Sequence, residues 1–295
     1  MSEIHHDFVS TPEGLRFHVA KIERNPNARR LALCLHGFPE CWYSWRHQMP
    51  LLADLGYRVW APDLRGYGES DKPQGVESYA IEKLVADVEA LIEESGASEI
   101  TLLGHDWGAI VAWVFATRHP SALERLVIMN VPHPGNASAR IREHPRQMLR
   151  SWYMLFFQLP WLPEKMLTSN QGARVGEMFA RTSVHPERFS RDDQAVYAAN
   201  VMRPGAASAM IHWYRALLRG GKRRQDALGW PVIETPTLMI WGEQDTALLK
   251  ETTYGTGDYV RDLTLEYLPD ASHWVQQDAP DTVNQLLKDW LTQSR

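Results

Sequence analysis

Short apolar runs alternate along the chain with longer amphipathic stretches. The short runs predict strands at residues 15–22, 31–35, 57–61, 100–103, 126–129, 237–241 and 264–268. The amphipathic stretches predict helices at residues 45–55, 81–95, 109–116 and 280–292. The residues before the first run, including His5 and His6, are polar and predict a tail. The alternation of strands and helices predicts an α/β fold, with a mostly parallel sheet flanked by helices on both faces.

One long segment interrupts this alternation. Residues 136–230 contain no clear buried-strand run, and they are rich in methionine and tryptophan. Prolines bound the segment, with Pro132 and Pro134 before it and Pro231 and Pro236 after it. We therefore predict an α/β core formed by residues 1–135 and 231–295, with a helical cap inserted over residues 136–230.

Composition narrows the class of protein. The 295 residues are 44% hydrophobic and 23% charged, as in a folded globular protein. A net charge of −5 without a basic block favours neither a nucleic-acid partner nor an anionic membrane. No apolar run has the length of a membrane span, and no secretion signal precedes the first strand. We therefore expect a cytoplasmic protein.

A candidate nucleophile lies between the strand at residues 100–103 and the helix at residues 109–116. The segment Gly104-His105-Asp106-Trp107-Gly108 has the context of a nucleophile elbow, but Asp106 occupies the position where esterases carry serine. A carboxylate that attacked a carbonyl would leave an anhydride, whereas attack on a saturated carbon gives an ester that water can hydrolyse. Asp106 therefore indicates a substrate with an electrophilic alkyl carbon and a leaving group.

Hydrolysis of that ester requires an oxyanion hole. In this architecture the hole combines the amide after the nucleophile with an amide from a loop after an earlier strand. Trp107 supplies the first amide. Phe38, in the loop His36-Gly37-Phe38-Pro39-Glu40, is the candidate for the second.

The same step requires a base. The chain order of the fold places an acid and then a histidine late in the sequence, and this order selects Asp245 and His273, each just past a predicted strand. Glu243 is a weaker competitor for the acid. Asn130 holds the alternative position for an acid, and its amide cannot act as a charged partner. His36 and His105 are predicted to structure loops.

The leaving group decides the reaction. A departing alkoxide needs a proton, whereas a halide needs only N–H donors. Tyrosine has an ordinary pKa of about 10 and can donate at neutral pH. The predicted cap contains Tyr153, Tyr197 and Tyr214. Tyr197 fits a packing role better, while the residues alone leave Tyr153 and Tyr214 balanced between packing and catalysis.

Taken together, these motifs resemble the α/β-hydrolase-fold epoxide hydrolases. The matching segments are 36–40, 42–46, 63–70, 104–108 and 272–274, together with the flanks of the two tyrosines. The resemblance implies a hydrolase that converts epoxides to vicinal diols through an aspartyl alkyl ester, without cofactor or metal. It assigns the nucleophile to Asp106, the charge-paired base to Asp245 and His273, the oxyanion hole to Phe38 and Trp107, and the proton donors to Tyr153 and Tyr214.

The apolar, aromatic cap predicts an apolar or aryl epoxide as substrate, with water as the second reactant. A homodimer formed through the cap is a further hypothesis.

Two other functions remain as alternatives. A haloalkane or haloacetate dehalogenase uses the same nucleophile, and Trp107 and Trp213 could donate to a halide. However, Phe38 stands where haloalkane dehalogenases often carry asparagine, and Trp107 and Ile110 stand where haloacetate enzymes carry arginines. A non-catalytic binding protein on the same scaffold would not need Asp106, Asp245 and His273 together.

Overall fold

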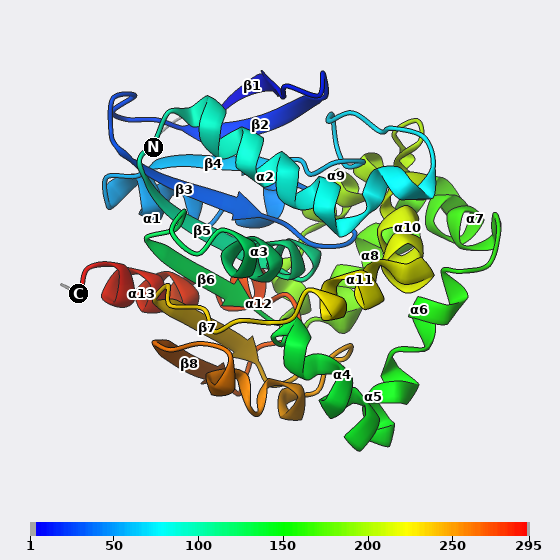
Figure 1. Cartoon of the computed structure of the whole chain (residues 1–295). Coiled ribbons are helices and arrows are strands. Elements are labelled where there is room, and N and C mark those ends of the chain that lie inside the picture. The colour runs from blue at the N-terminus through cyan, green and yellow to red at the C-terminus, as the bar shows by residue number, and fades with distance from the viewer. Residues whose placement is uncertain (1–3, 294–295) are drawn as a thin grey trace.

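The computed structural model describes residues 4–293, which form one eight-stranded sheet with helices on both faces (Figure 1). The strand order is β1-β2-β4-β3-β5-β6-β7-β8. The first two neighbouring pairs are antiparallel, and all the others are parallel. The α/β-hydrolase fold predicted above is therefore confirmed. The strands are β1 (His5–Ser10), β2 (Arg16–Ile22), β3 (Arg30–Leu35), β4 (Arg58–Pro62), β5 (Glu99–His105), β6 (Arg125–Met129), β7 (Thr237–Gly242) and β8 (Leu263–Leu268).

Two separate apolar clusters attach the helices to the sheet. The first cluster holds α2 (Ile81–Ser95) and α3 (Trp107–Arg118) against one face. The second holds α1 (Met49–Asp54), α12 (Val275–Asp278) and α13 (Pro280–Leu291) against the other. The central strands are buried on both faces, which explains why they are continuous apolar runs rather than alternating ones.

Two local predictions were wrong. The predicted helix over residues 45–55 is a 3₁₀ turn, η1 (Trp42–Trp45), followed by the separate helix α1. Pro50 accounts for the late start of α1, because proline is tolerated only in the first turn of a helix. The predicted tail is strand β1, in which His6 Nδ1 lies 3.0 Å from His18 Nε2 of β2. Its first three residues are polar and only Val9 of the strand is buried, so β1 lacks the apolar run that predicts a strand.

A run of helices separates β6 from β7. We call residues 134–227 the inserted segment; within the described chain it contributes no strand to the sheet. Figure 1 shows its helices beside the edge toward which the arrowheads of the parallel strands point. The division into core and cap domains stays a prediction. The helices are α4 (Pro134–Glu143), α5 (Pro145–Arg150), α6 (Trp152–Phe156), α7 (Leu162–Thr168), α8 (Ala173–Thr182), α9 (Arg191–Met202), α10 (Ala206–Ala216) and α11 (Lys222–Ala227).

Candidate active site

A strained turn presents Asp106 at the carboxyl end of β5. Its φ of 49° and ψ of −120° lie outside the regions that residues with a side chain usually adopt. The turn fits only because Gly104 and Gly108, two residues to either side of Asp106, lack side chains. A Cβ at Gly108 would lie 2.2 Å from the carbonyl oxygen of Leu35, and one at Gly104 would lie 2.6 Å from the carbonyl oxygen of Gly108. The elbow predicted from the sequence is therefore the geometry that is found.

The loop after β3 meets the Asp106 carboxylate. The Phe38 amide donates a hydrogen bond to Asp106 Oδ1 at 2.7 Å. Gly37 permits this approach, since a Cβ there would lie 2.3 Å from Asp106 Cβ. Trp107 follows the nucleophile as the first residue of α3, and no hydrogen bond joins its amide to the carboxylate within residues 4–293. Of the two predicted oxyanion-hole amides, only that of Phe38 thus contacts the carboxylate.

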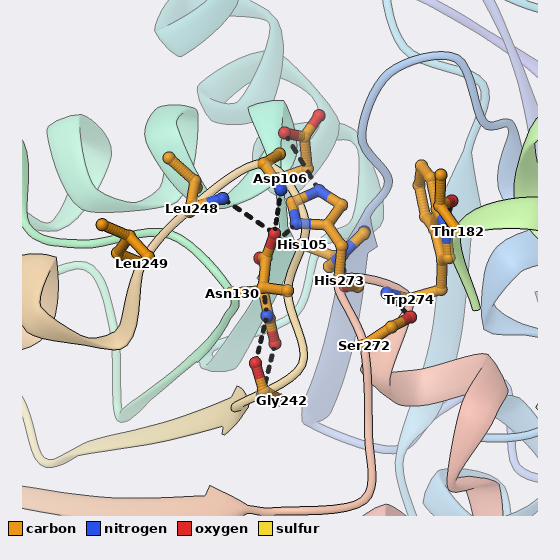
Figure 2. Close-up of polar contacts among 12 residues, drawn as sticks. His105, Asp106, Asn130, Thr182, Gly242, Leu248, Leu249, Ser272, His273 and Trp274 are labelled. Carbon is orange, nitrogen blue, oxygen red and sulfur yellow. Dashed lines mark hydrogen bonds and ion pairs between the residues drawn. The ribbon is translucent and has the colours of Figure 1, made fainter. Parts of the chain in front are cut away.

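His273 lies between the two predicted carboxylates; Figure 2 shows it beside Asp106. Its Nε2 is 3.4 Å from Asp106 Oδ2, and its Nδ1 is 2.6 Å from Asp245 Oδ2. All three residues follow strand ends at one edge of the sheet, where parallel sheets place their sites. Glu243, the competing acid, instead binds Lys250 Nζ at 2.5 Å. The structure therefore brings together the predicted Asp106, His273 and Asp245.

Asp245 is held by more than its histidine. Its Oδ1 accepts the amides of Ala247 and Leu248 at 2.7 and 2.8 Å. Its Oδ2 also accepts a hydrogen bond from Asn130 Nδ2 at 2.9 Å. This contact gives Asn130, excluded as a charged partner, an orienting role that the sequence did not predict. Its place directly after β6 is the only signal that could have indicated it.

A buried hydrogen-bond chain supports the base from below. His105 Nδ1 lies 2.8 Å from Glu40 Oε2, and His105 Nε2 lies 2.7 Å from the carbonyl oxygen of His273. Glu40 also accepts the Gly37 amide at 2.7 Å and Gln277 Nε2 at 2.9 Å. His105 and Glu40 therefore tie the loop that carries His273 to the loop that carries Phe38.

The surroundings of Asp106 and His273 favour the charged form of each side chain. Burial opposes charge on both groups, but the hydrogen bond and the charge of His273 hold the pKa of Asp106 below its usual value. For His273, burial again opposes the shift, while the charge of Asp245 and the hydrogen bond to Asp106 raise its pKa well above its usual value. Both shifts therefore favour a carboxylate as the nucleophile and a protonated His273 beside it.

Two cavities meet at the nucleophile. One, of about 190 Å³, extends past Ile110 to Trp230; the other, of about 330 Å³, extends past Phe38 to Trp152. Asp106, Tyr153 and Tyr214 line both. We call them the Trp230 cavity and the Trp152 cavity.

Ring contacts hold the two tyrosines over this junction. The rings of Tyr153 and Tyr214 lie 5.9 Å apart, and the Tyr214 ring packs 5.2 Å from Phe38 and 5.0 Å from Trp107. Burial, followed by the nearby charge of Asp106, raises the pKa of both hydroxyls. Both therefore keep a proton to donate. Tyr197 is instead buried and donates to Gln277 Oε1 at 2.6 Å.

Of the two alternative halide donors, Trp107 lines the Trp230 cavity, whereas Trp213 lines neither cavity. The Trp213 indole N–H donates to the carbonyl oxygen of Arg65 at 3.1 Å and is therefore already engaged. Ile110 lines the Trp230 cavity where a haloacetate enzyme would need an arginine.

Within the described chain, no three His, Cys, Asp or Glu residues group as metal ligands. Among those same residues, no helix is long and apolar enough to cross a membrane.

Comparison with known proteins agrees with this geometry. Residues 33–280 match the family model described as alpha/beta hydrolase fold. The chain is 39% identical to AB hydrolase superfamily protein YfhM of Bacillus subtilis, over 96% of both chains. It is 40% identical to epoxide hydrolase 4 of Mus musculus, covering 93% of this chain and 76% of that protein.

Solved structures of epoxide hydrolases are also similar to this chain. The Bacillus megaterium epoxide hydrolase bound to an inhibitor superposes with a TM-score of 0.87 at 31% identity, covering 97% of this chain and 100% of that one. Epoxide hydrolase A of Mycobacterium thermoresistibile superposes with a TM-score of 0.84 at 28% identity, covering 98% of each.

Proposed function

This chain belongs to the α/β-hydrolase-fold epoxide hydrolases, and we propose that it converts epoxides to vicinal diols through a covalent ester on Asp106. The observation that carries the proposal is the junction of the two cavities. There an ionised carboxylate faces two protonated tyrosines, and a histidine–aspartate pair stands behind it. A strained ether is the substrate that needs both a nucleophile and a proton donor at one point.

The first step opens the ring. Asp106 attacks one epoxide carbon and displaces the ring oxygen, which takes a proton from Tyr153 or Tyr214. The tyrosinate then recovers a proton from the protonated His273. The charges of Asp106 and His273 are both removed in this step: the carboxylate becomes a neutral ester, and the tyrosine and the histidine both end neutral. Esterification also removes the Asp106 charge, one of the causes that raise the pKa of His273.

The second step releases the diol. Neutral His273, oriented by Asp245, takes a proton from water, and the resulting hydroxide attacks the ester carbonyl of Asp106. The Phe38 and Trp107 amides stabilise the oxyanion, and one such donor is worth about 3 kcal/mol. Collapse breaks the bond to the diol oxygen, which takes the second proton of the water from the newly formed Asp106 acid, and the carboxylate–imidazolium pair is restored. No cofactor takes part in either step.

An apolar or aryl group on the epoxide fits the cavities, whose walls include Val114, Met154, Phe156 and Met166. The substrate choice, the cytoplasmic location, the helical cap and the homodimer stay predictions. Sedimentation velocity of the purified chain measures the last of these.

Diol and halide release distinguish the two candidate reactions. The enzyme is incubated separately with styrene oxide and with fluoroacetate, and the diol is quantified by chromatography and fluoride by an electrode. We expect diol formation without fluoride release. Fluoride release without diol would replace this proposal with the dehalogenase.

A further inference from the structure

The inserted segment exposes a strip of apolar side chains. Seven of the fourteen large apolar side chains that are exposed in the described chain lie between Met148 and Leu162, and we call these seven the apolar strip. They belong to α5, α6, the turn after α6 and the first residue of α7. Figure 1 shows α6 and α7 at the side of the molecule away from the sheet. A monomeric protein rarely concentrates exposed apolar surface in this way unless that surface contacts a partner.

The tip of the apolar strip is the turn between α6 and α7. Four consecutive residues there, Leu159-Pro160-Trp161-Leu162, are apolar and exposed. Trp161 is 67% exposed, and its φ of 51° lies in the left-handed region, which is unfavourable for a bulky side chain. Four exposed apolar residues in a row are unfavourable in water unless they have a function, and strained backbone also concentrates at functional sites. Both observations therefore indicate that the tip binds a partner.

The helices of the strip are attached to the protein by their inner sides. On α5, Gln147 is buried; its Nε2 donates to the carbonyl oxygen of Ala247 at 2.9 Å, and its Oε1 accepts the Leu249 amide at 2.7 Å. After α6, Phe157 is buried in the apolar core. Leu149, in contrast, is 76% exposed. The outer apolar side chains are therefore available to a partner.

The charges around the strip are positive. Residues 144–163 contain no Asp or Glu. Arg146 and Lys165 are exposed, and neither forms an ion pair with a carboxylate of the described residues. Glu164, the acid beside Lys165, is bound to Arg215 at 2.6 Å. The strip is therefore locally basic although the whole chain has a net charge of −5, which is why overall charge gave no sign of it.

We propose that the apolar strip docks the enzyme reversibly on an anionic lipid surface. Trp161 and its apolar neighbours enter the boundary between headgroups and acyl chains, where tryptophan is favoured, and Arg146 and Lys165 face the lipid phosphates. Trp152 belongs to the strip and also lines the Trp152 cavity, so docking brings that end of the cavity to the lipid.

Charge distinguishes this partner from a second copy of the chain. A two-fold contact would place strip against strip, and the cations at its edges would then meet cations of the same sign. Lipid phosphates neutralise those cations instead. A bilayer therefore matches both the apolar surface and its basic edges, whereas a second copy matches only the apolar surface.

Co-sedimentation with vesicles tests the proposal, with no substrate present. One set of vesicles contains equal parts of phosphatidylcholine and phosphatidylglycerol, and the other contains phosphatidylcholine alone. We expect wild type to bind the mixed vesicles, more weakly as salt is raised, and to bind the neutral ones less. Arg146→Gln should weaken binding to the mixed vesicles about fivefold and leave binding to the neutral ones unchanged. Equal binding of wild type to both sets would contradict an anionic surface.

Two variants remove apolar side chains from the strip. Trp161→Asn loses the indole and keeps the left-handed turn, which asparagine tolerates, and should weaken vesicle binding about 10-fold or more. Leu149→Gln should weaken it about fivefold. Leu228→Gln is the matched control, because Leu228 is an exposed leucine outside the strip and both cavities, and its variant should bind as wild type does.

The outcomes separate this inference from the proposed function. An enzyme that binds vesicles through the strip but hydrolyses no epoxide would contradict the proposed function alone. An active enzyme that binds no vesicles, or whose Trp161→Asn variant binds as well as wild type, would overturn the inference alone. Sedimentation velocity without lipid covers the other partner: a dimer that Trp161→Asn dissociates, with no vesicle binding, would assign the strip to a second copy and also overturn the inference.

Discussion

The two walls of the site are built in different ways. On the sheet side, hydrogen bonds to named donors fix the reacting groups: Asp245 accepts four, Asp106 accepts the Phe38 amide, and His273 contacts both acids. On the side of the inserted segment, ring packing positions Tyr153 and Tyr214. Hydrogen bonds fix the direction of single polar atoms, whereas edge-to-face ring packing fixes the planes of whole rings.

This difference divides the reaction between the walls. The sheet wall, which carries Asp106, His273 and Asp245, forms and hydrolyses the ester. A substitution of one of these residues therefore removes one of the two steps. The inserted wall protonates the leaving oxygen and shapes the substrate, so a change there slows a step or alters the preference for substrates. Four experiments test that division.

The largest effect is expected from the sheet wall at Asp106. Asp106→Asn removes the charged nucleophile while keeping the shape of the side chain, so we expect turnover to fall by at least about 10⁴-fold, with no ester formed. Steady-state rates and intact mass after mixing with styrene oxide measure both. Thermal unfolding serves as the control and should change by only a few degrees. Full activity in this variant would remove Asp106 from the chemistry.

The second effect separates the two steps within the same wall. His273→Gln keeps the nucleophile and removes the base, so ring opening continues, with the tyrosinate recovering its proton from solvent, while hydrolysis falls about 10³-fold. Intact mass should increase by one substrate and remain increased. Failure of this variant to accumulate the ester, with ring opening intact, would place the base elsewhere.

Substitutions in the inserted wall, which carries Tyr153 and Tyr214, should lower the rate of ring opening alone, and by a smaller factor. Tyr153→Phe and Tyr214→Phe each remove one of two donors, and we expect ester formation to slow about 10- to 100-fold while ester hydrolysis stays within about threefold. Rapid quenching followed by mass spectrometry resolves the two rates. Tyr197→Phe is the matched control, because its hydroxyl binds Gln277 outside the cavities. An equal effect of the control would assign all three tyrosines to packing.

The smallest effect is a difference between two pH profiles. Because the pKa of Asp106 is lowered, ester formation should lose rate only in acid, below about pH 4. Hydrolysis requires neutral His273, and Asp245 keeps the pKa of His273 raised. On acidification, the rate of hydrolysis should therefore fall at a higher pH than the rate of ester formation does. Burial and the charge of Asp106 raise the pKa of both tyrosines, so ester formation should persist above about pH 10. Single-turnover rates from about pH 3 to about pH 10.5 test this order, and coincident acid limbs would contradict it.

Local sequence patterns predicted the central strands of the sheet and the turn that carries Asp106. Continuous apolar runs indicated the central strands because those strands are buried on both faces. The elbow around Asp106 could be predicted because its glycines and its strand–helix context are adjacent in sequence. Chain order then gave Asp245 and His273.

Contacts between distant segments could not be predicted in this way. Asn130 and Asp245 are 115 residues apart, and only the pairing of β6 with β7 brings them together. His105 acts through the backbone carbonyl of another loop, and a carbonyl leaves no signature in the sequence. The exposed strand β1 was missed because its polar pattern also fits a tail.

One measurement tests the ester on Asp106 most directly. The enzyme, in excess over styrene oxide, completes a single turnover in water enriched in ¹⁸O, and the peptide that contains Asp106 is analysed by mass spectrometry together with the diol. Water attacks the ester carbonyl in this account, so one ¹⁸O should appear in the Asp106 carboxylate and none in the diol. An unlabelled peptide and a labelled diol would show that water opens the ring itself, and would contradict the account.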